Sequence, residues 1–175
     1  MNDILIEDGK PALTPEEFHR TWGQGPEADR REFLSHHSLQ ELIDLYDRRF
    51  PDYTKWATPI PGSKECLLKL RSLNKKIAVA SNSPSAVVRS LLKAADLEIL
   101  IDFAIGSDQV PNEKPAPDLL LKSLEILNLK REQACYIGDS IFDEQAARAA
   151  RIFLVGFKRE GDLSVQDFEA FMTLL

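Results

Sequence analysis

Cysteine is scarce in this chain of 175 residues, which contains only Cys66 and Cys135. Cys66 falls in a helical pattern and Cys135 at the start of an apolar strand pattern, so both are more typical of small core residues than of a disulfide. A reducing, cytoplasmic setting is therefore expected. No run of eighteen apolar residues occurs, and the N-terminus has no basic segment followed by an apolar one. The sequence thus predicts neither a membrane span nor a signal peptide.

Basic residues are also fewer than acidic ones, with 22 Lys and Arg against 28 Asp and Glu and a net charge of -6. The two signs are interspersed, whereas a nucleic-acid-binding surface needs clustered Lys and Arg. We therefore expect no nucleic-acid partner. A hydrophobic content of 43% and a charged content of 29% are typical of a globular protein. The length suffices for one core with a small accessory lobe.

The first third of the chain has helical patterns only. Residues 14–17, Thr-Pro-Glu-Glu, form a capping box with Pro at the first helical position and predict a short helix. Helical spacing of apolar residues predicts an amphipathic helix over 38–50, and the charged segment 26–37 before it predicts another. Residues 59–62, Pro-Ile-Pro-Gly, then punctuate the chain. We therefore expect a helical domain over residues 1–58.

Residues 59–175 alternate apolar strand patterns with amphipathic helices. The strand patterns cover residues 77–80, 103–106, 135–138 and 152–156. Helical periodicity predicts helices between these strands and a final helix at about 165–174. Such alternation implies right-handed crossovers and a mostly parallel sheet with helices on both faces. The expected fold class is α/β, with a small helical domain in front.

The most informative segment covers residues 135–147, Cys-Tyr-Ile-Gly-Asp-Ser-Ile-Phe-Asp-Glu-Gln-Ala-Ala. It predicts a strand, a turn and a helix, with Asp139 at the strand end and Asp143 in the first helical turn. Both carboxylates then lie at the C-terminal edge of the sheet, where ligands bind in open α/β folds. Hard oxygen ligands there suit Mg²⁺. A helix cap with a first-turn acid is an alternative that these residues alone leave open.

Two further stretches place polar residues next to predicted elements. Residues 77–84, Ile-Ala-Val-Ala-Ser-Asn-Ser-Pro, are a strand pattern that ends in Ser81 and Asn82. Residues 110–118, Val-Pro-Asn-Glu-Lys-Pro-Ala-Pro-Asp, place Lys114 among prolines that stiffen the backbone. Taken singly, the serine is typical of a turn and the lysine of a solvated surface.

In chain order, strand-Ser-Asn, Lys-Pro-x-Pro-Asp and Gly-Asp-x-x-x-Asp resemble three of the four motifs of the haloacid dehalogenase superfamily. The likeness is to its helical-capped, phosphoglycolate-phosphatase-like branch and runs from about Leu13 onward. It implies a Rossmann-like core over residues 59–175 with a helical cap, of which residues 1–58 would form a part.

 The implied activity is phosphatase-type hydrolysis of a small phosphorylated metabolite by Mg²⁺-dependent phosphoryl transfer. Substrate specificity would lie in the cap, so the sequence does not name the substrate.

The resemblance also implies a role for each polar residue. Ser81 would hold a phosphoryl oxygen, and Asn82 would either donate to the same oxygen or fix the turn. Lys114 would neutralise charge between the nucleophile and the phosphate, so Ser81 and Lys114 are the expected catalytic residues. Asp139 would be a direct Mg²⁺ ligand, and Asp143 an outer-shell or second ligand.

The family's first motif, an apolar strand followed by Asp-x-Asp-Gly-Thr, has no counterpart here. Its first Asp is the nucleophile, and aligning Asp8 and Gly9 with the motif puts Ile6 at that position. Isoleucine has no nucleophilic atom. The better alignment places residues 9–23 early in the cap, so the first core strand would lie upstream of Met1 or be lost. We therefore expect this chain alone to be inactive and to bind Mg²⁺ weakly, in the millimolar range.

In the family the missing strand is central, between the strands that here end at Ser81 and Asp139. Unpaired backbone groups beside such a gap would cost roughly 1–3 kcal/mol each if buried and unsatisfied. Residues 3–7 could fill the gap, the flanking strands could close up, or a partner chain could donate a strand. Self-association or strand donation is therefore an expected partnership.

Three functions stay open on the sequence: a phosphatase whose nucleophile is not in this chain, a non-catalytic phosphate- and Mg²⁺-binding or regulatory module, and a receiver-like signalling domain. The last fits worst, because a receiver has its acidic pair on early strands and no helical domain in front. Residues 22–25, Trp-Gly-Gln-Gly, are either a substrate-facing loop or a packing anchor. The histidines at 19, 36 and 37 are interpreted as surface or packing residues.

Overall fold

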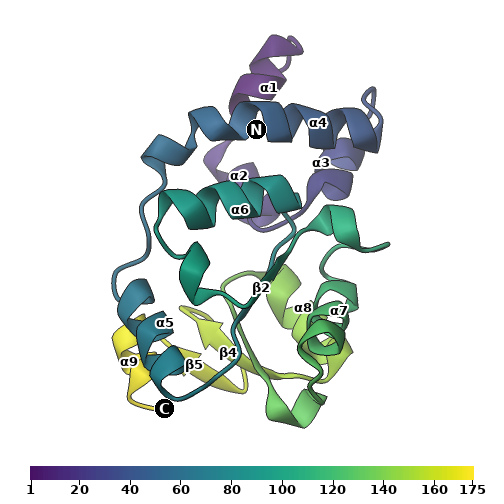
Figure 1. The fold of residues 1–175 in the computed structure, drawn as a ribbon. Coiled ribbons are helices and arrows are strands. Elements are labelled where there is room, and N and C mark those ends of the chain that lie inside the picture. Colours follow the sequence, from purple (N-terminus) through teal and green to yellow (C-terminus); the bar gives the residue numbers. More distant parts are fainter.

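The computed structural model describes residues 1–175. A group of helices at one end of the molecule lies above an α/β region (Figure 1). The helical end contains α1 (Asn2–Glu7), α2 (Pro15–Thr21), α3 (Pro26–Glu32) and α4 (Leu39–Arg49), followed by the 3-10 turns η1 (Phe50–Asp52) and η2 (Thr54–Trp56). We call α1 to α4 with their loops the helical lobe.

The α/β region alternates strands and helices, which confirms the predicted fold class. Its strands are β1 (Ala78–Ala80), β2 (Phe103–Ile105), β3 (Cys135–Gly138), β4 (Phe153–Phe157) and β5 (Leu163–Val165). Its helices are α5 (Ser63–Ser72), α6 (Ser85–Ala94), α7 (Asp118–Leu127), α8 (Ile141–Ala150) and α9 (Phe168–Met172), with the 3-10 turns η3 (Glu98–Leu100), η4 (Ser107–Gln109) and η5 (Arg131–Gln133). None of the helices combines the length and the apolar character that a membrane span requires.

Helix starts in the lobe follow the predicted capping chemistry. The Thr14 hydroxyl accepts a hydrogen bond from Glu17 N at 3.2 Å, and the Glu17 carboxylate accepts one from Thr14 N at 2.8 Å. Ser38 begins α4 with the same box. The helix expected over residues 26–37 ends earlier, at Glu32, and turns follow it up to the start of α4.

Residues 3–7 do not fill a gap in the sheet, and that expected alternative is wrong. They lie within α1, whose Ile4 and Leu5 pack against Leu34 and Leu42 in an apolar cluster of the lobe. A helix of six residues is marginal alone, so tertiary packing of its two buried side chains stabilises it.

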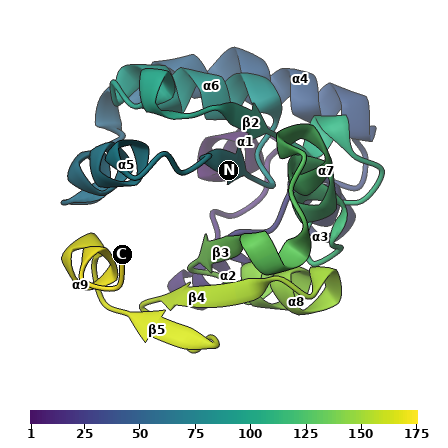
Figure 2. The same ribbon diagram turned by 60° about the horizontal axis from the view of Figure 1, so that its bottom comes forward.

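The sheet is divided into a two-stranded and a three-stranded part, and Figure 2 shows β2 apart from β3, β4 and β5. Strands β1 and β2 pair in parallel, with Ala78 opposite Phe103. Strands β3, β4 and β5 form a second parallel sheet, with Cys135 opposite Phe153. Strand β1 does not pair with β3, so the flanking strands have not closed up.

The end of the chain departs from the sequence-based expectation. Leu163–Val165 forms a fifth strand beside β4, with Val165 opposite Phe157. The final helix therefore begins at Phe168 and not at Val165, and the Asp167 side chain caps it by accepting from Ala170 N at 2.7 Å. A short three-residue strand after a loop carries too little periodicity to separate it from the helix that follows.

The α/β region has two apolar clusters, and both include residues of β4. One cluster joins α7, α8 and β4 through residues that include Leu120, Ala147 and Leu154. The other joins α5, β4, β5 and α9 and contains Cys66, a buried core residue as expected. Cys135 is exposed, contrary to expectation, because it opens β3 on the edge that lacks a strand neighbour.

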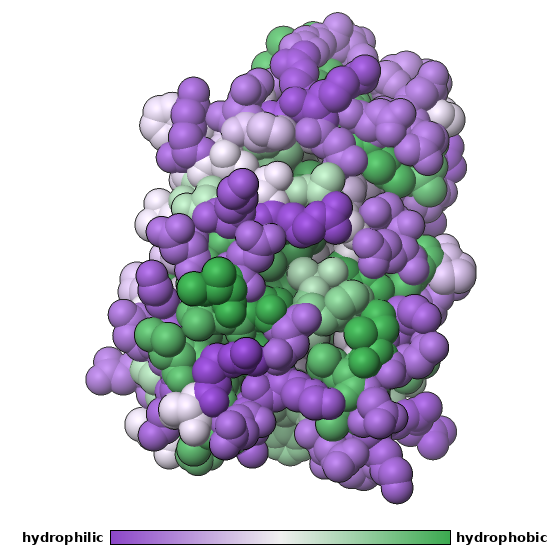
Figure 3. Space-filling view, in the orientation of Figure 1, coloured by the Kyte–Doolittle hydropathy of each residue, from purple (hydrophilic) through white to green (hydrophobic).

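Apolar surface gathers over the α/β region in the space-filling view, whereas the helical end is mostly hydrophilic on that face (Figure 3). Several large apolar side chains of the α/β region are exposed, among them Leu68, Ile99, Ile141 and Phe153.

Candidate active site at the strand ends

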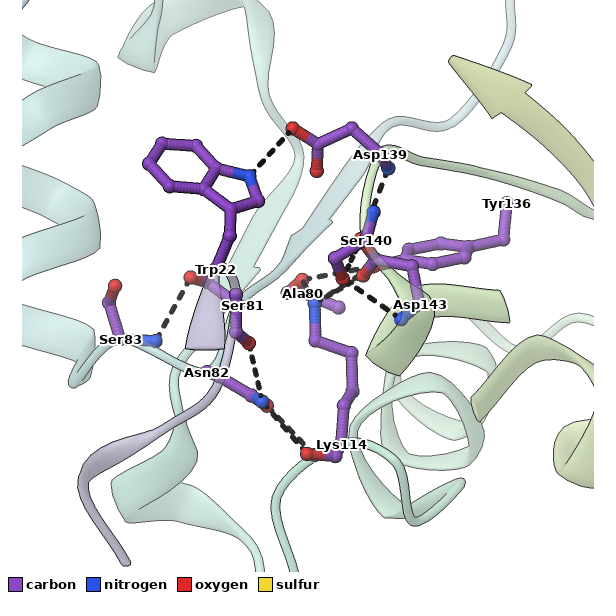
Figure 4. Close-up of polar contacts among 11 residues, drawn as sticks. Trp22, Ala80, Ser81, Asn82, Ser83, Lys114, Tyr136, Asp139, Ser140 and Asp143 are labelled. Carbon is purple, nitrogen blue, oxygen red and sulfur yellow. Dashed lines mark hydrogen bonds and ion pairs between the residues drawn. The ribbon is translucent and has the colours of Figure 1, made fainter. Parts of the chain in front are cut away.

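The three polar motifs converge where β1 and β3 end, as Figure 4 shows. Ser81 and Asn82 directly follow β1, and Asp139 directly follows β3. Lys114 reaches in from the loop before α7, and its Nζ lies 2.7 Å from Asp143 Oδ1. The same Nζ donates to the Ala80 carbonyl oxygen at 3.2 Å, so one ammonium group links the ends of both half-sheets.

Asp143 is the centre of this hydrogen-bond network. Its Oδ1 accepts from Lys114 Nζ and from the Tyr136 hydroxyl at 2.6 Å. Its Oδ2 accepts from Asp139 N at 3.1 Å, and from Ser140 N and Ser140 Oγ at 2.9 and 2.7 Å. With both oxygens occupied and the side chain 6% exposed, this carboxylate holds the turn and the lysine in place. Of its two expected roles, the contacts favour the outer-shell one.

Burial and charge act in opposite directions on the ionisable groups of the network. Burial by itself raises the pKa of Asp143, but the Lys114 ammonium and hydrogen bonds from Lys114, Tyr136 and Ser140 outweigh it and hold the pKa at about 2. Burial raises the pKa of Tyr136 well above its ordinary value, and the Asp143 charge raises it further. At neutral pH the network therefore contains an ionised carboxylate beside a protonated phenol.

Asp139 differs from Asp143 in that its carboxylate is exposed. Its Oδ2 accepts one long hydrogen bond, 3.4 Å, from the Trp22 indole nitrogen. The Asp139 side chain points toward the Trp22 indole, away from Asp143 (Figure 4). Magnesium is commonly held by one or two carboxylates together with water and substrate phosphate. An exposed carboxylate with a second one behind it fits such an ion, held weakly.

Ser81 and Asn82 make different kinds of contact. Ser81 Oγ accepts from Ser83 N at 3.1 Å, which leaves the hydroxyl hydrogen available to a phosphoryl oxygen. Asn82 is buried; its side-chain oxygen accepts from Lys114 N at 2.8 Å, and its amide nitrogen donates to the carbonyl oxygens of Lys114 and Gly23. Asn82 therefore positions the lysine loop here, and a substrate contact by Asn82 stays a prediction.

Residues 22–25 of the helical lobe lie against the strand-end network. Gly23 has a φ of +87°, and a Cβ placed on it would come within 2.8 Å of Ser140 Cβ, so only glycine fits. The adjacent Trp22 is 52% exposed and contacts Asp139, which supports the substrate-facing interpretation of this loop. Glu113 makes a second link, because its carboxylate accepts from Ala28 N at 3.1 Å.

Sequence reasoning missed Tyr136 and Glu113. Each stands beside a residue that it did identify: Tyr136 lies in the strand before Asp139, and Glu113 precedes Lys114. A tyrosine in a strand is an ordinary β-former, so only the fold reveals that its hydroxyl meets Asp143. Glu113 contacts the lobe 85 residues earlier in the chain, which no local pattern encodes.

A cavity of about 300 Å³ lies between the helical lobe and the end of β1. Its lining includes Trp22, Gln24, Asp29, Tyr46 and Ser83. Burial raises the pKa of Asp29, against hydrogen bonds that Tyr46 and Gln24 donate to it. The cavity is thus mainly apolar with a small polar group set into its wall, a composition typical of small-molecule sites.

Glu7 and Asp8, the acids nearest to the missing first motif in sequence, do not face Lys114. Glu7 pairs with Arg49, and Asp8 is contacted by His36 and His37, all within the helical lobe. Neither carboxylate stands in for the nucleophile in this arrangement.

Comparison with known proteins shows similarity to a hydrolase family and to two enzymes that are named for phosphorus compounds. The sequence model described as haloacid dehalogenase-like hydrolase matches residues 1–157. The phosphoglycolate phosphatase of Escherichia coli O157:H7 is 31% identical over 157 residues, covering 88% of this chain and 62% of the relative. The phosphonoacetaldehyde hydrolase of Bordetella pertussis is 28% identical over 141 residues, covering 77% and 51%.

The chain therefore spans only about half to three fifths of the length of these relatives. Among solved structures, a phosphoglycolate phosphatase-like protein from Lactobacillus plantarum aligns over 99% of this chain and 88% of its own, with a TM-score of 0.86 and 21% identity. CbbY from Rhodobacter sphaeroides in complex with phosphate aligns over 95% and 84%, with a TM-score of 0.81 and 21% identity. At these identities the structural likeness shows the fold.

Proposed function

The chain belongs to the haloacid dehalogenase-like hydrolase family, and on this premise we propose that its strand-end site serves a phosphatase-type reaction on a small phosphorylated metabolite, with Mg²⁺. The observation that carries the proposal is the placement of Lys114 Nζ between the ends of β1 and β3, 2.7 Å from a buried carboxylate. A fixed ammonium at the carboxyl ends of parallel strands is suited to the charge of a phosphoryl group.

Each polar residue then has a defined task. Ser81 would donate its hydroxyl hydrogen to a phosphoryl oxygen, and Lys114 would compensate charge as the phosphoryl group is transferred. Asp139 would hold Mg²⁺, with Asp143 behind it, and the bound ion would supply further positive charge to the phosphoryl oxygens. The helical lobe, which we propose as a cap over residues 1–58 above a core of residues 59–175, would close the cavity over the substrate.

The chain alone would stabilise the charge of the phosphoryl group but would not transfer the group. Complete transfer needs an oxygen nucleophile that attacks phosphorus while the ester P–O bond breaks, after which water releases the phosphate. Glu7 and Asp8 are held in the helical lobe, and Asp143 is occupied by its five hydrogen bonds. We therefore propose that this chain alone binds phosphate and Mg²⁺ without turnover.

A strand that carries a carboxylate would complete the site by pairing between β1 and β3. Each of these strands has one edge without a strand neighbour. Such an edge is a template for an added strand. The strand would come from a longer polypeptide or from a partner, through self-association or donation.

A non-catalytic phosphate- and Mg²⁺-binding module is the second candidate function, and the divided sheet favours it. Both candidate functions require phosphate binding, and only the phosphatase requires turnover. Calorimetric titration with inorganic phosphate in the presence of Mg²⁺ tests binding, and hydrolysis of p-nitrophenyl phosphate tests turnover.

We expect weak phosphate binding and no hydrolysis by the chain alone. Ser81→Ala should weaken phosphate binding by about tenfold, the usual effect of one lost hydrogen bond to a charged group, whereas Lys122→Met on the exposed face of α7 should not change it. Absence of phosphate binding would refute the proposal. Hydrolysis that disappears in Asp139→Asn would show that the chain carries its own nucleophile.

A further inference from the structure

Three potential metal ligands meet in the helical lobe, on elements separate from the strand-end site. Asp8 follows α1, and His36 and His37 lie in the loop between α3 and α4. One ligand atom from each residue lies within 4.8 Å of the other two. We infer that Asp8, His36 and His37 form a binding site for a divalent transition-metal ion of the Zn²⁺ class.

The spacing of the ligand atoms is close to what such an ion requires. Asp8 Oδ2 lies 2.9 Å from His36 Nε2 and 3.2 Å from His37 Nε2. Tetrahedral Zn²⁺ with bonds of about 2.0–2.1 Å separates its ligand atoms by about 3.3–3.4 Å. Lengthening these two distances by a few tenths of an ångström therefore brings them to the spacing around a bound ion. The imidazole rings lie side by side, with centroids 4.2 Å apart.

The backbone on both sides of the cluster is held by packing. Residues 34–37 form a turn in which His37 N donates to the Leu34 carbonyl oxygen at 3.0 Å. The buried Leu34 packs against Ile4 and Leu5 of α1, the helix that ends at Asp8. The loop and the helix end are thus brought together by apolar contacts, so that binding the ion costs little ordering of the chain.

The donor set determines the class of ion. Two imidazole nitrogens and one carboxylate suit Zn²⁺ and its neighbours Co²⁺, Ni²⁺ and Cu²⁺, whereas Mg²⁺ prefers oxygen ligands. Three protein ligands leave a fourth position for water. The side chains of Asp8 and His37 are 19% and 24% exposed, and that of His36 is 51% exposed, which provides access from solvent.

Without an ion, Asp8 Oδ2 lies beside the Nε2 atoms of both imidazoles and is hydrogen-bonded to that of His37. Zn²⁺ would bind the Nε2 lone pair of each imidazole, and each ring would then have its proton on Nδ1. The ion would then join the end of α1 to the α3–α4 loop, across 28 residues of chain. Because it binds the folded lobe and not the unfolded chain, it would raise the melting temperature.

Calorimetric titration of the whole chain with Zn²⁺ alone tests the site. We expect one ion per chain, and Co²⁺ in its place should give visible absorption typical of tetrahedral coordination. His36→Gln, His37→Gln and Asp8→Asn should each weaken Zn²⁺ binding by about tenfold or more. The third histidine provides a matched control: His19→Gln, with the ring beside the Pro15 carbonyl oxygen in α2, should bind Zn²⁺ as the natural chain does.

Two more variants separate this site from other donors in the chain. Cys135→Ser removes the exposed thiol and Asp139→Asn the exposed strand-end carboxylate, and both should keep the ion. The inference is overturned if the natural chain binds no Zn²⁺, if His36→Gln and His37→Gln bind it as tightly as the natural chain, or if Cys135→Ser or Asp139→Asn abolishes binding. Circular dichroism of each metal-free variant shows that a loss of binding is not a loss of folding.

Discussion

The two halves of the sheet end in opposite chemistry. The β1–β2 half ends in the hydroxyl and amide of Ser81 and Asn82, whereas the β3–β4–β5 half ends in the carboxylates of Asp139 and Asp143. No backbone hydrogen bond of the sheet joins them. The links at the strand ends are the side chain of Lys114 and a long hydrogen bond, 3.5 Å, from the Tyr136 hydroxyl to the Ala80 carbonyl oxygen. The site is therefore held across the divided sheet by side-chain contacts, and a neighbouring strand is not needed to position them.

Helix α7 supports this arrangement from one side, because it contacts β1, β2 and α8. Its Leu120 and Leu124 belong to the apolar cluster that includes Ala147 and Leu154, and Ala80 at the end of β1 packs against the same cluster. Apolar packing thus brings the halves together, and the charged pair fixes their polar ends. The following predictions test how much each contribution matters.

Removing the Asp143 charge should have the largest effect on the link. Asp143→Asn leaves the Lys114 ammonium buried without its ion-pair partner, which typically costs about 3–5 kcal/mol. Urea denaturation measures the loss in the free energy of unfolding. Asp139→Asn, four residues earlier and exposed, is the matched control and should change stability by less than about 0.5 kcal/mol. Equal losses in both variants would show that the buried pair does not join the halves.

Acid should weaken the same link in a defined pH window. Asp143 has its pKa lowered to about 2 from an ordinary value of 3.8. Ionised Asp143 therefore adds about 2 kcal/mol to the free energy of unfolding. This stabilisation is fully present above about pH 4 and is lost as the pH falls toward 2. Urea midpoints measured at pH 5 and near pH 2 should show the stability difference between the natural chain and Asp143→Asn shrinking by about this amount. A constant difference would contradict the lowered pKa.

Gly23→Ala should disturb the contact between the helical lobe and the acidic half. The substitution strains a φ of +87° and places a methyl group 2.8 Å from Ser140 Cβ. Gly9→Ala is a control with a φ of +71° and no atom within 4 Å of the added carbon. Backbone strain alone costs about 1–2 kcal/mol, so Gly23→Ala should lose more stability than Gly9→Ala in urea denaturation. Equal losses would mean that the loop moves aside freely.

Asp139→Asn should give the smallest stability effect and a clear functional one. Its carboxylate makes one long hydrogen bond, so folding depends little on it. Mg²⁺ binding should nevertheless weaken to below detection, since the variant loses the exposed carboxylate. Calorimetry with Mg²⁺ checks this, with Asp118→Asn at the start of α7 as a control. Unchanged Mg²⁺ affinity in Asp139→Asn would remove Asp139 from the proposed metal site.

Local signals in the sequence predicted most of the elements and the convergence of the motifs. The capping box at Thr14 predicted one helix start correctly, because a cap is encoded by residues within one turn. The polar residues after β1 and β3 were expected to meet because the ends of parallel strands share one edge. The alternation of strand and helix patterns over residues 59–175 predicted the fold class.

Contacts between distant segments could not be predicted in this way. Residues 3–7 are apolar enough for a strand or a helix, and only packing against Leu34 and Leu42 decides for α1. The contacts of Asp8 with His36 and His37 depend on that same packing. The hydroxyl of Tyr136 and the carboxylate of Glu113 likewise gain partners only in the fold.

The central claim is that this chain binds phosphate and lacks only a carboxylate nucleophile. Its most direct test is p-nitrophenyl phosphate hydrolysis with Mg²⁺, before and after addition of a synthetic apolar strand peptide that ends in Asp-x-Asp-Gly-Thr. We predict no turnover by the chain alone, turnover with the peptide, and none with a peptide whose first Asp is Asn. Turnover by the chain alone, or a bound Asp peptide without turnover, would contradict the account.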